Sequence, residues 1–282
     1  MKKIQEINLD EIYEDEFRNV KSYLFDHKLD DYLKMIQEEN NPVDFKEQLL
    51  MITQLYYDGI LKYQMWSGNV FGLKSKEFSL KLEILNKLIL SGKIAVGSFY
   101  DGKGIDADEV RDIFMPYISD ILRYGDVEAD SKSRHLRSDW SDVQDFGIAL
   151  QERLDSKVKF PDVVVSVASG GLEPAYLAMH ITEKDDLFVL RYSKEREDSK
   201  VQVFGKDNNY FDGKDLKDKN VFVIDDIIET GTTMFNVLKY IFNLKPSELY
   251  GSSVYSRFIT PIKPYIEIID SKPLLFRYAA DC

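Results

Sequence analysis

The pattern of apolar and polar positions changes near Pro161, and the two parts of the chain predict different kinds of structure. Downstream of Pro161, short apolar runs alternate with stretches of helical periodicity. This alternation predicts an α/β fold with a mainly parallel sheet covered on both faces. The expected strands cover residues 162–168, 187–192, 221–225 and 249–255, and the expected helices cover 141–154, 172–181 and 233–243.

Residues 1–127 have a helical pattern instead and are expected to form a separate N-terminal domain, followed by a second domain at 128–282. The clearest start signal is Asn41-Pro42, a capping side chain followed by proline at the first helical position. Apolar residues then recur at helical spacing as far as about Met65. Two further helices are expected at 77–90 and 106–125.

Composition and charge narrow the class of protein. No apolar run reaches the roughly 18 residues that span a bilayer, and the N-terminus turns polar at once, so neither a membrane partner nor a signal peptide is expected. The single cysteine, Cys282, excludes a disulfide within one chain and favours the cytoplasm. Of the net charge of −12, residues 1–130 contribute −9, with 16 Lys and Arg against 25 Asp and Glu. That balance argues against nucleic acid as a partner.

Residues 221–233 carry most of the functional information. They read Val-Phe-Val-Ile-Asp-Asp-Ile-Ile-Glu-Thr-Gly-Thr-Thr, which is an apolar strand, two acids, and a small-residue turn that leads into a helix. The N–H groups of such a turn can hold a phosphate, and Gly231 lets the backbone approach it closely. Asp225 and Asp226 can accept hydrogen bonds from vicinal sugar hydroxyls. The segment therefore predicts a sugar-phosphate site that is neither a P-loop nor a dinucleotide-binding turn.

A second glycine-containing turn, Ser169-Gly170-Gly171, follows the first expected strand. Taken alone, it is equally well read as a tight connection without a ligand. Its position favours a ligand, because the turns after parallel strands meet at the carboxyl edge of the sheet, where open α/β sheets bind their ligands.

Together these segments resemble the type I phosphoribosyltransferases over about residues 140–260. Residues 221–233 correspond to that family's phosphoribosyl-pyrophosphate motif, and the Gly-Gly turn corresponds to its pyrophosphate turn. The resemblance implies that Asp225 and Asp226 bind the ribose hydroxyls and contribute to a Mg²⁺ site, and that Glu229 acts as an acid or base beside the acceptor. It implies further substrate contacts, to the 5-phosphate from Thr230, Gly231, Thr232 and Thr233 and to pyrophosphate from Ser169, Gly170 and Gly171.

The acceptor side is less defined by the sequence. Arg257 follows the last expected strand, where it either meets an exocyclic oxygen of the acceptor or is simply solvated. Phe276 and Tyr278 are expected in the core rather than stacked on a base. The charged stretch 195–219 is expected to be a connection that closes over the site.

Two functions agree with these features. The first is a Mg²⁺-dependent phosphoribosyltransferase, which takes phosphoribosyl pyrophosphate and a nucleobase or similar nitrogen acceptor as its partners. The second is a non-enzymatic regulatory protein that senses phosphoribosyl pyrophosphate or a nucleotide. The intact acids and glycines favour the enzyme, and a homodimer is possible in either case.

Overall fold

The computed structural model describes residues 2–4, 8–14, 27–66, 76–126, 140–154, 156, 158–168, 170–192, 201–204, 216–257, 266–271 and 274–278. The chain divides into two compact units, one formed by Gln5–His135 and the other by Met1–Ile4 together with Leu136–Cys282. The expected boundary between residues 127 and 128 lies outside the described residues.

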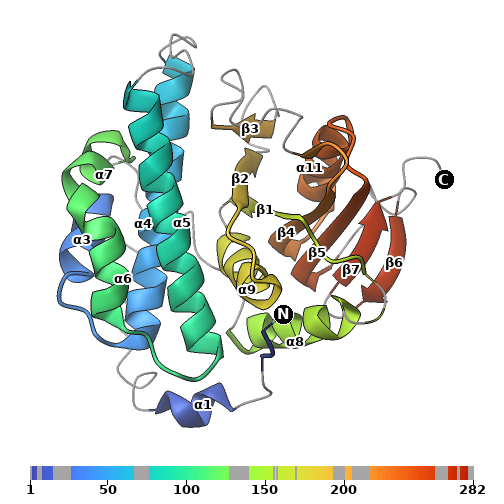
Figure 1. Cartoon of the computed structure of the whole chain (residues 1–282), viewed down its shortest axis with the longest axis horizontal. Coiled ribbons are helices and arrows are strands. Elements are labelled where there is room, and N and C mark those ends of the chain that lie inside the picture. The colour runs from blue at the N-terminus through green and yellow to red at the C-terminus, as the bar shows by residue number, and fades with distance from the viewer. Residues whose placement is uncertain are drawn as a thin grey trace. The chain divides into compact units, whose positions relative to one another are not determined.

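The described part of the Gln5–His135 unit is helical (Figure 1). Its elements are α1 (Leu9–Ile12), α3 (Leu29–Met35), α4 (Pro42–Trp66), α5 (Lys76–Tyr100), α6 (Ala107–Phe114), the 3-10 helix η2 (Met115–Tyr117) and α7 (Ile118–Tyr124). The predicted start of α4 is confirmed, because the Asn41 carboxamide accepts hydrogen bonds from the N–H groups of Val43 (3.0 Å) and Asp44 (3.1 Å). Among the described helices, none has both the length and the apolar character needed to cross a membrane.

Two predicted helix boundaries in this unit are wrong. The helix expected to stop at residue 90 continues to Tyr100, because Ala95, Val96 and Phe99 extend its buried face. The helix expected over 106–125 is interrupted at Pro116, whose ring nitrogen cannot donate a helical hydrogen bond.

The other unit is built on a sheet of seven strands among the described residues, in the order β3-β2-β1-β4-β5-β7-β6 (Figure 1). The strands are β1 (Val163–Ala168), β2 (Leu187–Tyr192), β3 (Val201–Val203), β4 (Asn220–Ile228), β5 (Glu248–Ser256), β6 (Ile266–Ser271) and β7 (Leu274–Tyr278). β2, β1, β4 and β5 run parallel, and the outer strands β3, β7 and β6 pair antiparallel. The predicted fold class is confirmed in its parallel core, its flanking helices and the helical region that precedes them, and the sheet as a whole is mixed, because three of its six described strand pairings are antiparallel.

Three helices flank this sheet, namely α8 (Trp140–Leu154), α9 (Leu172–Thr182) and α11 (Thr232–Phe242) (Figure 1). α11 packs on the face that carries Val165 and Val223, whereas α9 packs against β1 and β4, and α8 against β5. Every residue of β1 is buried, as expected for a central parallel strand covered on both faces. Because helices cover the two faces of the sheet, the ends of the strands are where this domain can present groups to a ligand.

The antiparallel strands were not predicted. β3 lies inside the expected charged connection 195–219, where Val203 is buried and pairs with Leu190 of β2. Residues 195–200 and 205–215 of that connection are outside the described residues, so its closure over the site stays a prediction. In β7, Phe276 and Tyr278 are buried in the core cluster, which confirms the prediction that they are core residues.

Candidate functional site

Asp225 and Asp226 both lie inside strand β4. The prediction ended this strand at Asp225, but parallel pairing with β5 continues to the partners Ile228 and Ser256, which keeps the backbone extended. Successive side chains of a strand point to opposite faces, so the two carboxylates are directed to opposite sides of β4. Asp225 is buried and Asp226 is partly exposed. The acids therefore present two separate contacts rather than one cluster.

Backbone N–H groups orient both carboxylates. The Asp226 N–H donates to Asp225 Oδ1 at 3.0 Å, and the Ile227 N–H donates to Asp226 Oδ1 at 2.7 Å. Within the described part of the chain, no group of three or more His, Cys, Asp or Glu side chains could hold a metal ion. A cation in this site would thus need oxygen ligands from a substrate in addition to these carboxylates.

The turn after β1 packs directly against these acids. A Cβ added to Gly170 would overlap the carboxylate of Asp226. A Cβ at Gly171 would lie 2.6 Å from the Ile224 carbonyl oxygen and 2.7 Å from that of Val167. Both positions therefore require glycine for close approach, and the structure brings the Gly-Gly turn against the acidic pair of β4. Ser169, the remaining residue of this turn, is outside the described residues.

The turn after β4 leads into α11 through a glycine in the left-handed region. Gly231 has a φ of 78°, and its carbonyl accepts the Phe235 N–H at 2.8 Å as the helix begins. The Thr230 hydroxyl donates to the Thr232 hydroxyl at 3.1 Å and accepts the Thr232 N–H at 3.4 Å. Since the first N–H groups of a helix have no partner within it, the N-terminus of α11, including Thr233, offers donors that suit an anion.

Glu229 and Arg257 lie together at the same edge. The Arg257 N–H donates to the Ile228 carbonyl at 2.9 Å, which holds the residue beside the end of β4. Its guanidinium Nη1 is 4.0 Å from Glu229 Oε1, and the two side chains are 61% and 45% exposed. An exposed pair of this kind contributes at most about 1 kcal/mol, so a ligand can readily replace it. The guanidinium carbon also lies 5.7 Å from the centroid of the Tyr255 ring.

Two residues at this edge were missed by the sequence reasoning. Arg191 is in register with Ala168, so its backbone lies beside the end of β1, from which the Gly-Gly turn follows. The Tyr192 hydroxyl accepts a hydrogen bond of 3.1 Å from Asn236 on α11. The sequence does contain a signal for both residues: they directly follow the apolar run 187–190, at the carboxyl end of a predicted parallel strand.

Comparison with known families bears directly on this edge of the sheet. Residues 143–257 match the family model described as the phosphoribosyl transferase domain, and this span includes both glycine turns and Arg257. The chain contains a phosphoribosyl transferase domain.

Several solved structures resemble this phosphoribosyl transferase domain. A purine phosphoribosyltransferase from Pyrococcus horikoshii Ot3 is 27% identical, with 43% of this chain and 84% of the other covered and a TM-score of 0.34. A hypothetical protein from Neisseria gonorrhoeae with bound ppGpp is 20% identical, with 42% and 69% covered and a TM-score of 0.35. A hypoxanthine-guanine phosphoribosyltransferase from Bacillus anthracis is 18% identical, with 51% and 97% covered and a TM-score of 0.33. No curated protein matched the chain.

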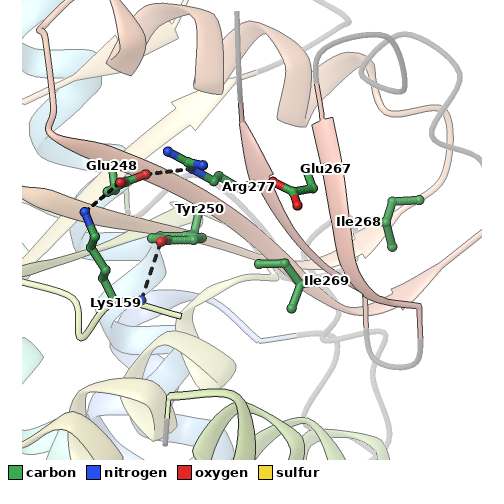
Figure 2. Close-up of a pocket in the computed structure, with 7 residues that line it drawn as sticks. All are labelled: Lys159, Glu248, Tyr250, Glu267, Ile268, Ile269 and Arg277. Carbon is green, nitrogen blue, oxygen red and sulfur yellow. Dashed lines mark hydrogen bonds and ion pairs between the residues drawn. The ribbon is translucent and has the colours of Figure 1, made fainter. Parts of the chain in front are cut away.

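The phosphoribosyl transferase domain also has a groove of about 490 Å³ at the opposite edge of its sheet, near the amino ends of the parallel strands (Figure 2). It is lined by Lys159, Glu248, Tyr250, Glu267, Ile268, Ile269 and Arg277. The Glu248 carboxylate accepts hydrogen bonds from Lys159 Nζ and Arg277 Nε, each at 2.7 Å. Because Glu248 and Glu267 together balance the charges of Lys159 and Arg277, the groove is poorly suited to an anion. The ion pairs of Glu248 join β5 to β7 and to the segment before β1.

The same ion pairs make the stability of this domain depend on pH. Burial opposes the ionisation of Glu248, but the hydrogen bonds from Lys159 and Arg277 outweigh burial and hold its pKa below the usual value. Ionised Glu248 therefore stabilises the fold above the pKa of an unfolded glutamate, about 4.3, and this stability is lost as the pH falls through the lower, folded pKa. Glu248→Gln should lower the free energy of unfolding by about 1 kcal/mol at pH 7.

Thermal melting of the full chain at pH 7 and at pH 3 checks this expectation. The difference between wild type and Glu248→Gln should be largest at pH 7 and should shrink at pH 3. Glu267→Gln is the matched control, because it removes an exposed carboxylate from the same groove and should have a smaller effect. Equal destabilisation by Glu248→Gln at both pH values would show that the charge of Glu248 is not what stabilises the fold.

Proposed function

We propose that the phosphoribosyl transferase domain transfers phosphoribosyl from phosphoribosyl pyrophosphate to a nucleobase or a similar nitrogen acceptor, with Mg²⁺ required. The observation that carries this proposal is the contact between the two motifs. The Gly170 backbone lies so close to the Asp226 carboxylate that no side chain fits between them. A ribose-binding acid and an anion-binding turn then stand side by side, as a donor with a pyrophosphate on its ribose requires.

Each part of the donor has a matching group in this arrangement. The 5-phosphate lies on the turn from Thr230 to Thr233, at the N-terminus of α11. The ribose hydroxyls donate to Asp225 and Asp226. Pyrophosphate lies along the Gly170-Gly171 turn, where Arg191 supplies positive charge.

In the transfer, the bond from ribose C1 to the pyrophosphate oxygen breaks, a bond from C1 to the acceptor nitrogen forms, and that nitrogen loses its proton. Glu229, 45% exposed at the edge of the site, is the carboxylate placed to take this proton. Arg257 beside it has donors for an exocyclic oxygen of the acceptor. Carboxylate oxygens are ligands that Mg²⁺ prefers, and a metal held by Asp225 or Asp226 would, when bound, neutralise charge on the pyrophosphate. Because the two carboxylates lie on opposite sides of β4, such a metal would contact one of them and take its other oxygen ligands from the substrate. Beyond these contacts, the protein contributes to the transfer by positioning the donor and the acceptor and by excluding water from the site.

The second candidate is a protein that binds phosphoribosyl pyrophosphate or a nucleotide without turnover and passes that signal on. It is favoured by the separate helical unit Gln5–His135, which lies outside the matched residues 143–257. The same donor contacts serve both functions. The two candidates differ only in whether an acceptor reacts.

A turnover assay separates the two. The full chain is incubated with phosphoribosyl pyrophosphate, Mg²⁺ and each of a panel of purine and pyrimidine bases, and released pyrophosphate and the nucleoside monophosphate are measured. We expect equal amounts of both products with at least one base, and none without Mg²⁺. Donor binding by calorimetry without turnover of any base would instead support the sensor. Absence of both binding and turnover would contradict both functions.

A further inference from the structure

A chain of hydrogen bonds joins the end of β2 to the phosphate turn. The Asn236 side-chain amide on α11 donates to the Tyr192 hydroxyl at 3.1 Å and to the Thr232 backbone carbonyl at 2.8 Å. The Thr232 hydroxyl in turn accepts from the Thr230 hydroxyl at 3.1 Å. Asn236 therefore touches both the last residue of β2 and the turn that the donor 5-phosphate is proposed to occupy.

The Tyr192–Asn236 hydrogen bond connects elements on either side of strand β1. β2 and β4 are not neighbours in the sheet, because β1 lies between them. Adjacent strands are about 4.8 Å apart, so the ends of β2 and β4 are separated by about twice that distance. The backbone links these ends only through β1, whereas the Tyr192–Asn236 bond links β2 to α11 directly. Both side chains are partly buried, which shields the bond from competing water.

The two ends that the bond joins correspond to the two anionic parts of the proposed donor. The α11 turn is the proposed 5-phosphate subsite, and the end of β2 pairs through Arg191 with Ala168 at the end of β1, which leads into the Gly170-Gly171 turn proposed for pyrophosphate. A ligand that must reach both subsites gains affinity when their separation is fixed in advance. A ligand that occupies one subsite gains nothing from that constraint.

We propose that Tyr192 and Asn236 are positioning residues that fix the distance between the 5-phosphate and pyrophosphate subsites. They act through the turn and the strand that they join, without touching the ligand. This inference rests on the proposed function, since it takes phosphoribosyl pyrophosphate as the ligand that spans both subsites. It predicts a loss of affinity confined to ligands with both anionic groups.

The test compares one bridging ligand with its two parts. Calorimetry in Mg²⁺ measures the affinity of wild type and Tyr192→Phe for phosphoribosyl pyrophosphate, ribose 5-phosphate and pyrophosphate. Tyr192→Phe keeps the ring and removes only the hydroxyl, so affinity for phosphoribosyl pyrophosphate should fall about fivefold, as for one lost hydrogen bond, with both parts bound as before. Asn236→Leu should act in the same direction. Adding Tyr192→Phe to Asn236→Leu should cause no further loss, because both changes remove the same bond.

Tyr117→Phe is the matched control. Its hydroxyl donates to Glu83 Oε1 at 2.5 Å within the helical unit, so this variant also loses one tyrosine hydrogen bond and should keep all three affinities. The proposal is overturned if Tyr192→Phe and Asn236→Leu both bind phosphoribosyl pyrophosphate as wild type does. It is equally overturned if all three ligands weaken by the same factor, since that would indicate direct contact or general damage. If the wild-type protein binds none of the three ligands, the proposed function itself is contradicted. That result differs from the two outcomes that overturn only the positioning role.

Discussion

Gly170→Ala should abolish measurable binding of phosphoribosyl pyrophosphate. The new methyl group would overlap the Asp226 carboxylate, so either the carboxylate must swing away or the turn must move. Either movement displaces a group that the proposed donor site needs. Misplacement by about 1 Å costs roughly 100-fold at well-oriented sites, and we expect at least that loss of affinity. Calorimetry with phosphoribosyl pyrophosphate and Mg²⁺ measures it.

Gly147→Ala is the matched control for this change. Gly147 lies on α8, and its added methyl group would meet the flexible end of the Leu177 side chain, 2.7 Å from Cδ2. That variant should lose some stability and retain donor affinity, which separates damage to the fold from damage to the site. Wild-type affinity in Gly170→Ala would show that the Gly170–Asp226 contact has no part in donor binding.

The second large effect is expected from the double replacement Asp225→Asn and Asp226→Asn. Asparagine keeps the size of the side chain and an oxygen that can accept the N–H groups of Asp226 and Ile227, so the fold should survive. The negative charge that is proposed to receive the ribose hydroxyls is lost. Two hydrogen bonds to charged groups are worth about 1.5–3 kcal/mol each, so donor affinity should fall roughly 100-fold or more.

Calorimetric titration of this double variant with phosphoribosyl pyrophosphate in Mg²⁺ measures its donor affinity. Asp162→Asn serves as its control, because Asp162 Oδ2 accepts the Asn220 N–H at 2.9 Å at the amino edge of the sheet, away from the two turns. It should bind the donor as wild type does. If the double variant also binds normally, the ribose is held by other residues and the assignment of both acids fails.

Local sequence was sufficient for the elements whose signals are local. The cap at Asn41, the helix after Gly231 and the strand 187–192 follow from side-chain hydrogen bonding, backbone freedom and apolar spacing within a few residues. The glycine turns could be assigned to one edge, because parallel strands place their carboxyl ends together. For the same reason the sequence alone was enough to propose the candidate site, and the family match over 143–257 confirms the resemblance on which that proposal rests.

Other features depended on contacts between distant residues. β4 extends to Ile228 because β5 pairs with it, which no pattern inside 221–233 reveals. The break at Pro116 is different, because it follows from the missing N–H of proline, a local signal that helical periodicity alone does not register. β3 is short and lies in a charged stretch, and only its pairing with β2 makes it a strand.

The amino-acid sequence by itself determined the turn into α11, the acidic pair, the Gly-Gly turn and the α/β class of the sheet that carries them, because each is encoded in neighbouring residues. Only the tertiary structure decided that Asp226 lies against Gly170, that Arg191 stands beside that turn, and that Asn236 reaches Tyr192 across β1. The physical reason is that strand order and register set these distances. Both are fixed by the packing of the whole sheet and its helices, and not by any one segment.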